Sequence, residues 1–366
     1  MIIIYMILLV IFFLSCIIKK SRILMLLQFF WCWLLYGLNT GGADYIENEA
    51  IYLIGRYYLY DNIKIGTTWL ADLLYIIFNR LNFSYIEFNL ITGLIAFGIV
   101  FFIVWKISKA PNIVYALLMV YPMSEFIMQK RFFLAISLIM LGIYWFSTID
   151  NKIKKNIALL ICILLAVGLH FSTIFYLSLF CMNIDENKGI KHKLKIVFLL
   201  IIGGIPILII GTKWGLISQE KISNYLSGDT SGISLYKIPY FFLLQVYLYY
   251  VTFLLYKKKN KGCKFEFNFM KYSKLLLFLL PTYFINTIFR RYYIHLIPLN
   301  YILMSDDYIL NLNSKKTITV HLSLVINVLI IIYLAFIETR FFGDIGFDKL
   351  IVDLYRNNLI FKYLIL

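Results

Sequence analysis

The strongest constraint on this fold is one long apolar stretch whose two ends carry the same charge. Residues 157–181, IALLICILLAVGLHFSTIFYLSLFC, are long and apolar enough to cross a membrane. Lysines precede the stretch in DNKIKKN and follow it in DENKGIKHKLK, and lysine-rich loops favour the cytoplasmic side. A simple span would place one of these loops on the wrong side. We therefore predict a broken segment that enters from the cytoplasm, turns near residues 168–172 and returns.

His170 occupies the predicted turn. A helix from Ile157 to His170 would rise about 20 Å, which is most of the ~30 Å hydrocarbon core, so we expect His170 in the outer half of the membrane. Irregular backbone is tolerated at that depth only against protein or a wet cavity. The sequence therefore predicts a site at this break. The alternative is a core histidine bonded to a backbone carbonyl.

The composition indicates a membrane protein. Of the 366 residues, 62% are hydrophobic and only 15% are charged, which is too little charge for a soluble domain of this length. The net charge of +16 comes from lysines between apolar runs, so we interpret it as a topology signal and as contacts with anionic membrane lipid, not with nucleic acid. The five cysteines form no CxxC pair. Metal-binding and nucleotide-binding motifs are absent from the sequence, so we expect no metal and no cofactor.

The apolar runs predict an all-α polytopic membrane protein with about ten transmembrane helices in addition to the broken segment. We treat residues 1–366 as a single integral membrane domain with polar loops on the outer face at residues 39–87 and 211–237. Two interfacial helices, Tyr45–Tyr60 and Thr67–Leu81, are expected in the first loop because each has an apolar and a polar face. The predicted spans are Ile2–Ile18, Ile23–Leu38, Phe88–Trp105, Pro111–Met128, Phe132–Phe146, Ile196–Ile210, Ile238–Tyr256, Leu275–Phe289, Tyr292–Leu310 and Thr317–Ile337.

Several cations fall on the outer face of this topology, where positive charge is disfavoured. Arg131 lies at one outer hairpin, and Arg290 and Arg291 lie at another. They are either anchors at helix ends or ligands for phosphate oxygens, which the planar guanidinium binds through paired hydrogen bonds. We expect the second role, with Lys130 and Arg56 as further cations in contact with substrate.

The remaining polar candidates surround these cations in the predicted topology. Ser172 follows His170 by two residues, and the pair suits a general base or a contact to a sugar hydroxyl. His295 lies one helical turn beyond Arg291 and shares its face. Asp44 and Glu47 form a D-x-x-E pattern that caps a helix, and the same two residues are candidates for substrate contact or catalysis.

Four short motifs resemble a known family. They are Gly-Gly-x-Asp-Tyr from Gly41 to Tyr45, R-x-x-x-A from Arg131, G-x-H-x-S from Gly168 to Ser172, and R-R-x-Y from Arg290 to Tyr293. Their order resembles the EpsG-like branch of the Wzy-type polysaccharide polymerases of the bacterial inner membrane. Phe132 departs from that pattern, since the family often has a glutamine after the arginine.

The resemblance implies a glycosyltransferase in the bacterial inner membrane whose active site faces the periplasm or outside. It implies that a glycan on undecaprenyl pyrophosphate is moved onto the next lipid-linked oligosaccharide unit. A chain-length regulator and a flippase of the same pathway are the expected protein partners. The family features fall on Asp44 and Tyr45, Arg131, His170 and Ser172, and Arg290. We expect Tyr293 to contact the substrate. We expect His170, Asp44, Arg131 and Arg290 to be catalytic.

Three other functions remain open at this point. A flippase or other transporter often has paired halves, and the sequence contains no second copy of the broken segment. A membrane O-acyltransferase would use a histidine to activate a hydroxyl, but a cytoplasmic acyl donor suits an outer-facing His170 poorly. A polysaccharide ligase shares the chemistry of a polymerase, and the sequence does not separate the two.

Overall fold

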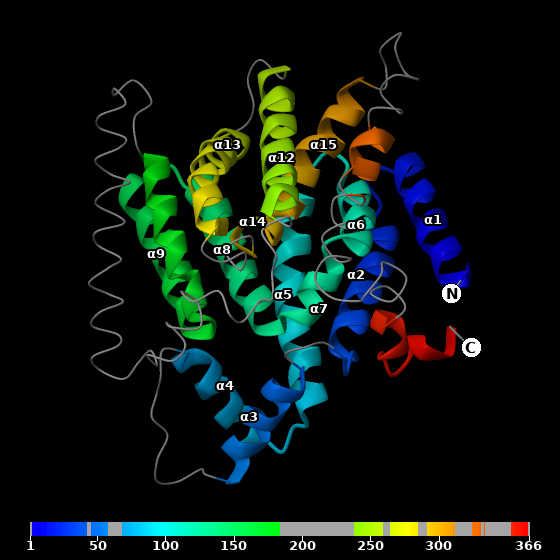
Figure 1. The fold of residues 1–366 in the computed structure, drawn as a ribbon, viewed down its shortest axis with the longest axis vertical. Helices are drawn as coiled ribbons and strands as arrows, with labels where there is room; N and C mark the ends of the chain where they lie inside the picture. The colour runs from blue at the N-terminus through cyan, green and yellow to red at the C-terminus, as the bar shows by residue number, and fades with distance from the viewer. Residues whose placement is uncertain are drawn as a thin grey trace.

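The computed structural model describes residues 2–41, 45–57, 68–183, 238–258, 264–284, 291–311, 324–330, 333 and 353–364. These residues form a bundle of helices (Figure 1). Within these ranges the only β-pairing is an isolated bridge between Asn39 and Asn358. The predicted all-α class is therefore confirmed for the described part of the chain.

The helices follow the predicted apolar runs, with changed boundaries. The first half contains α1 Ile2–Ile17, α2 Arg22–Gly37, α3 Tyr45–Tyr57, α4 Trp69–Arg80, α5 Tyr85–Ile107, α6 Pro111–Val120, α7 Met123–Met128, α8 Lys130–Thr148, α9 Lys152–Leu169 and the 3-10 helix η1 Phe171–Asn183. The second half contains α12 Ile238–Lys258, α13 Lys264–Leu276, the 3-10 helix η3 Leu277–Phe284, α14 Arg291–Ile294, α15 Ile297–Asn311 and the 3-10 helix η5 Phe361–Leu364. Among the described residues, α5 and α8 are long and apolar enough to cross a membrane. The total of ten spans and the single domain stay predictions.

The predicted break in residues 157–181 is observed. α9 ends at Leu169, and His170 has extended backbone angles (φ −151°, ψ 108°). The chain then reverses into η1, and Asn183 at its end donates a hydrogen bond from Nδ2 to Oδ1 of Asn156, 2.8 Å away, in the first half of α9. The segment therefore returns to the end of the bundle from which it started. Its cytoplasmic orientation stays a prediction, because the second lysine loop lies outside the described residues.

Two predicted continuous spans are wrong, because prolines interrupt them. The span Pro111–Met128 is divided into α6 and α7 at Tyr121 and Pro122, since proline lacks the N–H that a continuing helix needs and its ring blocks the preceding turn. The span Tyr292–Leu310 is divided into α14 and α15 at His295 and Leu296. Pro298 follows as the second residue of α15, a position in the first turn that tolerates proline.

Other boundaries moved because polar residues begin the helices. α5 begins at Tyr85 instead of Phe88, since Ser84 and Glu87 form a reciprocal capping box. The predicted span Leu275–Phe289 does not form one α-helix: its first two residues end α13, Leu277–Phe284 form η3, and residues 285–289 lie outside the described residues. The two helices expected in the first loop are observed as α3 and α4, and their interfacial position stays a prediction. The predicted span Ile196–Ile210 and the loop 211–237 lie outside the described residues, as does most of Thr317–Ile337.

An exposed helix face and a close helix contact are both typical of a membrane bundle. α9 exposes an apolar stripe of Ile157, Leu160, Ile161 and Leu164, as expected for a face against lipid. Inside the bundle, α2 and α5 approach so closely that a Cβ on Gly93 would lie 2.6 Å from the ring of Tyr36. Small residues at helix contacts are typical of membrane bundles.

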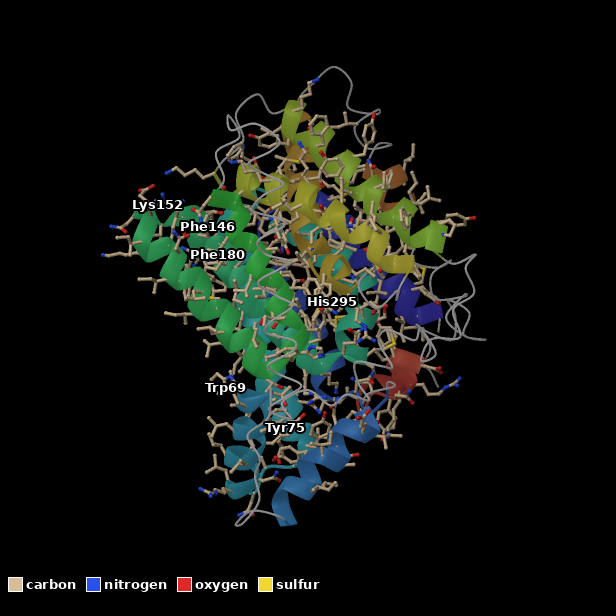
Figure 2. All side chains as sticks on the ribbon, turned by 60° about the vertical axis from the view of Figure 1, so that its left-hand side comes forward. Trp69, Tyr75, Phe146, Lys152, Phe180 and His295 are labelled. Atoms are coloured by element: carbon tan, nitrogen blue, oxygen red, sulfur yellow. The ribbon has the colours of Figure 1, made fainter. Side chains whose placement is uncertain are left out.

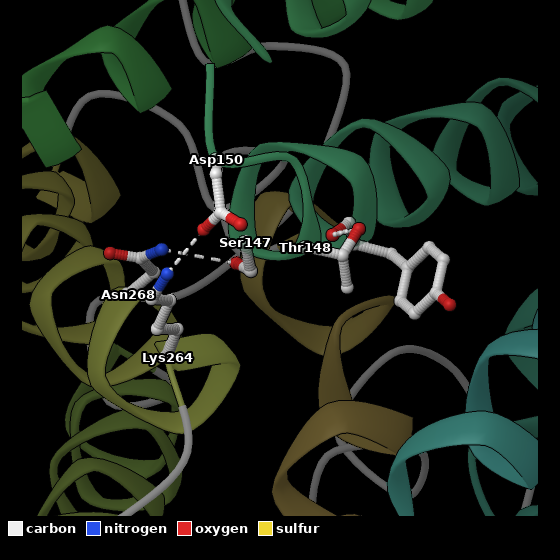
Figure 3. A network of polar contacts seen from close by, with 6 residues as sticks. Ser147, Thr148, Asp150, Lys264 and Asn268 are labelled. Carbon is white, nitrogen blue, oxygen red and sulfur yellow. Dashed lines mark hydrogen bonds and ion pairs between the residues drawn. The ribbon is translucent and has the colours of Figure 1, made fainter. Parts of the chain in front are cut away.

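The two ends of the bundle carry different elements. At one end, Lys264 of α13 binds Asp150 between α8 and α9 at 2.5 Å, and Asn268 donates to Ser147 at 3.1 Å (Figure 3). The hydrogen bond and charge of Lys264 lower the pKa of Asp150. The opposite end carries α3 and α4 (Figure 1). We call it the α3–α4 end.

Candidate functional site

Phe132, near the start of α8, connects the two histidines that the sequence analysis singled out. Its ring centroid lies 4.9 Å from that of His170 and 4.7 Å from that of His295, and both pairs meet edge to face. Tyr292 contacts the same ring at 6.2 Å. Phe132 is only 2% exposed. The break after α9 and the break between α14 and α15 therefore meet at one buried phenyl ring.

His170 is half-buried and held by its own segment. Its Nδ1 lies 2.7 Å from Oγ of Ser172, and its backbone carbonyl accepts hydrogen bonds from the N–H and hydroxyl of Thr173. Because Ser172 occupies Nδ1, a proton taken from substrate would arrive at Nε2. That role requires the tautomer in which Nδ1–H donates to Ser172.

The second break supplies Arg291 and His295. Nδ1 of His295 lies 3.0 Å from the carbonyl oxygen of Arg291, so the predicted one-turn relationship is observed. His295 is completely buried, whereas Arg291 is half-buried at the first position of α14. Tyr293 is buried, and its hydroxyl has no hydrogen-bond partner among the described residues. His295 thus belongs to the wall of the site, and Arg291 is the more accessible of the two.

Arg131 is half-buried in the first turn of α8, and its charge acts on Tyr75 of α4. Burial raises the pKa of Tyr75, and the nearby positive charge of Arg131 opposes that rise. The N-cap residue of α8, Gln129, makes no side-chain capping hydrogen bond. An uncapped helix N-terminus carries partial positive charge and unsatisfied N–H groups. Arg131 adds a full positive charge at the same place.

Lys130 lies in a different environment from its neighbour. It is 5% exposed, and its Nζ donates to the carbonyl oxygen of Asn39 at 2.7 Å. The ammonium also lies over the rings of Tyr36 and Tyr45, at 5.4 and 5.0 Å from their centroids. Burial and nearby Glu49 raise the pKa of Tyr45. These contacts favour a structural role for Lys130, and they place buried Tyr45 beneath it.

Trp69, at the start of α4, packs directly against the segment that carries His170. A Cβ on Gly168 would lie 2.6 Å from Cε2 of Trp69 and 2.8 Å from Cβ of Leu70. Trp69 is nevertheless 38% exposed. Figure 2 shows Trp69 and Tyr75 at the junction of α4 with the bundle and His295 farther inside. α4 therefore forms one wall of the site beside His170.

This contact leads to a stability prediction with a matched control. We expect Gly168→Ala to destabilise the protein by about 1–3 kcal/mol, since an inserted methyl group in a packed contact forces its neighbours apart. Gly98→Ala in α5 should be neutral or stabilising, because no atom lies within 4 Å of the added Cβ and alanine favours a helix by about 1 kcal/mol over glycine. Thermal melts of the detergent-purified variants measure both. Equal melting temperatures for the two variants would contradict the observed packing.

The remaining predicted residues fall outside this cluster or outside the described structure. Asp44 and Arg290 lie outside the described residues, and so does the side chain of Arg56. Glu47 is exposed on α3. The structure thus brings His170 and His295 together on Phe132. Ser172 joins through its hydrogen bond to His170, and Arg291 joins through its backbone carbonyl at His295. Arg131 precedes Phe132 on the same helix.

The sequence analysis missed two residues near this site. Glu125 in α7 is 3% exposed and accepts a hydrogen bond from Gln129 at 3.0 Å. An ionisable group inside an apolar run was a signal for it. Trp69 had no comparable signal, because its importance depends on a contact with Gly168. Within the described ranges, no group of three or more His, Cys, Asp or Glu side chains could hold a metal ion.

Comparisons with known proteins give one match. The sequence profile described as the EpsG family matches residues 22–347, which is most of the chain. No curated protein and no solved structure matches.

Proposed function

Because the chain belongs to the EpsG family of Wzy-like polysaccharide polymerases, we propose that it polymerises lipid-linked oligosaccharide units at the outer face of the bacterial inner membrane. The donor is a growing glycan on undecaprenyl pyrophosphate, and the acceptor is the next lipid-linked unit. The observation that carries this proposal is the meeting of His170 and His295 at Phe132, the residue that follows Arg131 in the first turn of α8. Ser172 is hydrogen-bonded to His170, and the backbone carbonyl of Arg291 is hydrogen-bonded to His295.

In the proposed reaction an acceptor hydroxyl oxygen attacks the anomeric carbon of the donor sugar. A new carbon–oxygen bond forms as the bond to pyrophosphate breaks, and the electron pair of the broken bond leaves with the pyrophosphate. The acceptor proton passes to Nε2 of His170, with Asp44 as the other candidate base. Pyrophosphate is a good leaving group, so this step needs no general acid. No protein nucleophile takes part in the single displacement.

The start of α8 is suited to the pyrophosphate. Helix N-termini bind anions through exposed N–H groups and the helix dipole, and a cation there is unfavourable by about 0.3–1 kcal/mol unless an anion balances it. The absence of a side-chain cap at Gln129 and the presence of Arg131 in the first turn together fit a ligand with two phosphates. Arg290 and Arg291 are the proposed partners of Arg131 in stabilising the charge that develops as the bond breaks.

We assign a sugar contact to Trp69. Its half-exposed indole lies beside the segment of His170, and an aromatic ring combines an apolar face with a polar N–H. That combination suits a sugar, which has C–H groups on one face and hydroxyls around its rim. Tyr45, Glu47, Arg56, Tyr293 and His295 stay predicted substrate contacts. Lys130 is assigned to support of the loop that begins at Asn39.

A defined assay tests the proposed function. Purified protein in nanodiscs is supplied with a synthetic lipid-linked repeat unit, and the products are separated on a gel. A ladder of increasing length is expected, with release of undecaprenyl pyrophosphate. A single shift to another acceptor lipid without a ladder would indicate a ligase instead. In a parallel assay with the protein in sealed vesicles, movement of unchanged substrate to the opposite leaflet without a ladder would indicate a flippase.

The orientation is tested separately by cysteine labelling. In a background without native cysteines, Asn187→Cys should resist a membrane-impermeant thiol reagent added to intact spheroplasts, because the lysine loop that contains it is predicted to be cytoplasmic. Arg80→Cys, at the exposed end of α4, should react readily. Labelling of Asn187→Cys from outside would contradict the re-entrant topology. Protection of Arg80→Cys would mean that α4 and the site face the cytoplasm instead of the outside.

A further inference from the structure

The C-terminal residues 353–364, which we call the C-terminal strap, lie against the end of α2 (Figure 1). Four hydrogen bonds join the strap to the loop that follows α2, one of them from the hydroxyl of Thr40 to the carbonyl of Asn357 at 3.0 Å. The N–H of Leu359 donates to the carbonyl of Leu38 at 3.1 Å, and that of Thr40 donates to the carbonyl of Asn357 at 2.9 Å. Nδ2 of Asn39 donates to the carbonyl of Leu354 at 2.5 Å. The loop is thus paired with the opposite end of the chain.

Asn358 fixes the strap to α2 itself. Its Nδ2 donates to the carbonyls of Leu34 and Leu35 at 2.9 and 3.1 Å. The last carbonyls of a helix have no partner within the helix. The carbonyl of Leu34 also accepts the N–H of Leu38 at 3.1 Å, so it is chiefly the carbonyl of Leu35 that gains a partner from Asn358. Its Oδ1 accepts the N–H groups of Ile360 and Phe361, both at 3.0 Å. Asn358 is completely buried.

The same loop is held from the other side by α8. The carbonyl oxygen of Asn39 accepts the hydrogen bond from Lys130, and Lys130 directly precedes Arg131. Oδ1 of Asn39 accepts from the N–H of Gly41 at 2.9 Å. Asn39 therefore makes three links. Its side-chain Nδ2 bonds to the strap, its backbone carbonyl bonds to Lys130 of α8, and its Oδ1 bonds to Gly41 in the same loop. Asp44 follows Gly41 by three residues in the sequence.

Gly41 is the point where strap and loop approach most closely. A Cβ on Gly41 would lie 2.3 Å from Nδ2 and 2.7 Å from Cβ of Asn357. The backbone of Gly41 is not in the left-handed region, so alanine is excluded by this contact and not by its own conformation. The position therefore offers a direct test of the contact.

We propose that Asn357 and Asn358 are positioning residues for the transferase site, through the loop Asn39–Gly41 and Lys130 to Arg131. The strap fixes the loop against the first turn of α8, and misplacement by about 1 Å can lower a rate by about 10²-fold. This inference rests on the proposed function. The strap lies beyond residue 347, where the family match ends.

The test uses the full-length protein in nanodiscs with the synthetic lipid-linked repeat unit. Gly41→Ala should lower kcat by about 10²-fold while KM stays near its wild-type value. It should also lower the melting temperature, because the added methyl group overlaps the side chain of Asn357. Asn357→Gly keeps the backbone carbonyl that binds Thr40 and removes the clashing Cβ, so it should be mildly impaired. The double variant Gly41→Ala/Asn357→Gly should recover the activity of Asn357→Gly alone. Only a direct contact between the two positions predicts this rescue.

Each other result decides against the proposal. Normal kcat in Gly41→Ala, or a double variant as inactive as Gly41→Ala, would show that the strap does not position the site. A lowered melting temperature with unchanged kcat in the folded fraction would show a structural role alone. If the wild-type protein itself makes no polymer while remaining folded, the proposed function fails, and the strap contact is then judged by the melting temperatures alone.

Discussion

Replacing His170 with alanine is expected to lower kcat by about 10²- to 10⁴-fold, the range that a general base contributes. KM for the lipid-linked unit should change little, because Arg131 and the other proposed pyrophosphate ligands remain in place. His170→Gln should fail equally, since its amide keeps hydrogen-bonding capacity but accepts no proton at neutral pH. The measurement is steady-state polymerisation by the purified variants, with thermal melts to confirm that they are folded.

Two controls separate a base from a structural histidine. Ser172→Ala removes the group at Nδ1 of His170 and should lower kcat less than His170→Ala, because the ring remains but its tautomer is no longer fixed. A structural histidine predicts the opposite pattern for the His170 variants: glutamine restores polymerisation, and alanine reduces the amount of folded protein. With that outcome, Asp44 becomes the proposed general base.

Replacing Arg131 with lysine is expected to lower kcat by about 10²- to 10³-fold, the cost of removing one group that stabilises developing charge. Lysine keeps the positive charge but loses the planar fork that binds two phosphate oxygens together. The variant should retain the wild-type melting temperature, since Arg131 is only half-buried. Single-turnover rates on the synthetic donor, measured at saturating acceptor, isolate this step.

Arg80→Lys is the matched control for this substitution. Arg80 lies exposed at the end of α4, so the same chemical change at that position should leave the rate unchanged. Equal and near-normal rates for both variants would indicate that Arg131 is a helix-end anchor. A normal rate with a strongly lowered melting temperature in Arg131→Lys would assign Arg131 to packing against Tyr75.

The positions of the helix breaks show how far local signals reach. The break at His170 was predictable because two lysine loops and one apolar run conflict within a short stretch of sequence. The breaks at Pro122 and Pro298 had an equally local cause, because a proline disrupts the hydrogen bonds of a continuing helix. The sequence analysis overlooked them by giving apolar continuity more weight than the prolines.

The site depends on information of another kind. His170 and His295 were each singled out from the sequence, but their meeting at Phe132 is a contact among α8, the end of α9 and the break before α15. Phe132 itself entered only as a departure from the family pattern. Lys130 and Arg131 are adjacent in sequence, yet their side chains have different surroundings. Lys130 is buried and donates a hydrogen bond to the carbonyl of Asn39, whereas Arg131 is half-buried near Tyr75.

The sequence by itself determined that this chain is a helical membrane protein with a break at His170, because hydropathy and charge act over a few helical turns and need no knowledge of neighbours. Only the tertiary structure decided which helix faces meet. Adjacent side chains on a helix point about 100° apart, so Lys130 and Arg131 enter different surroundings once α8 packs. In the same way, the chain's last described residues reach Asn39 and Gly41 only because the bundle brings α2 and the C-terminal strap to one place.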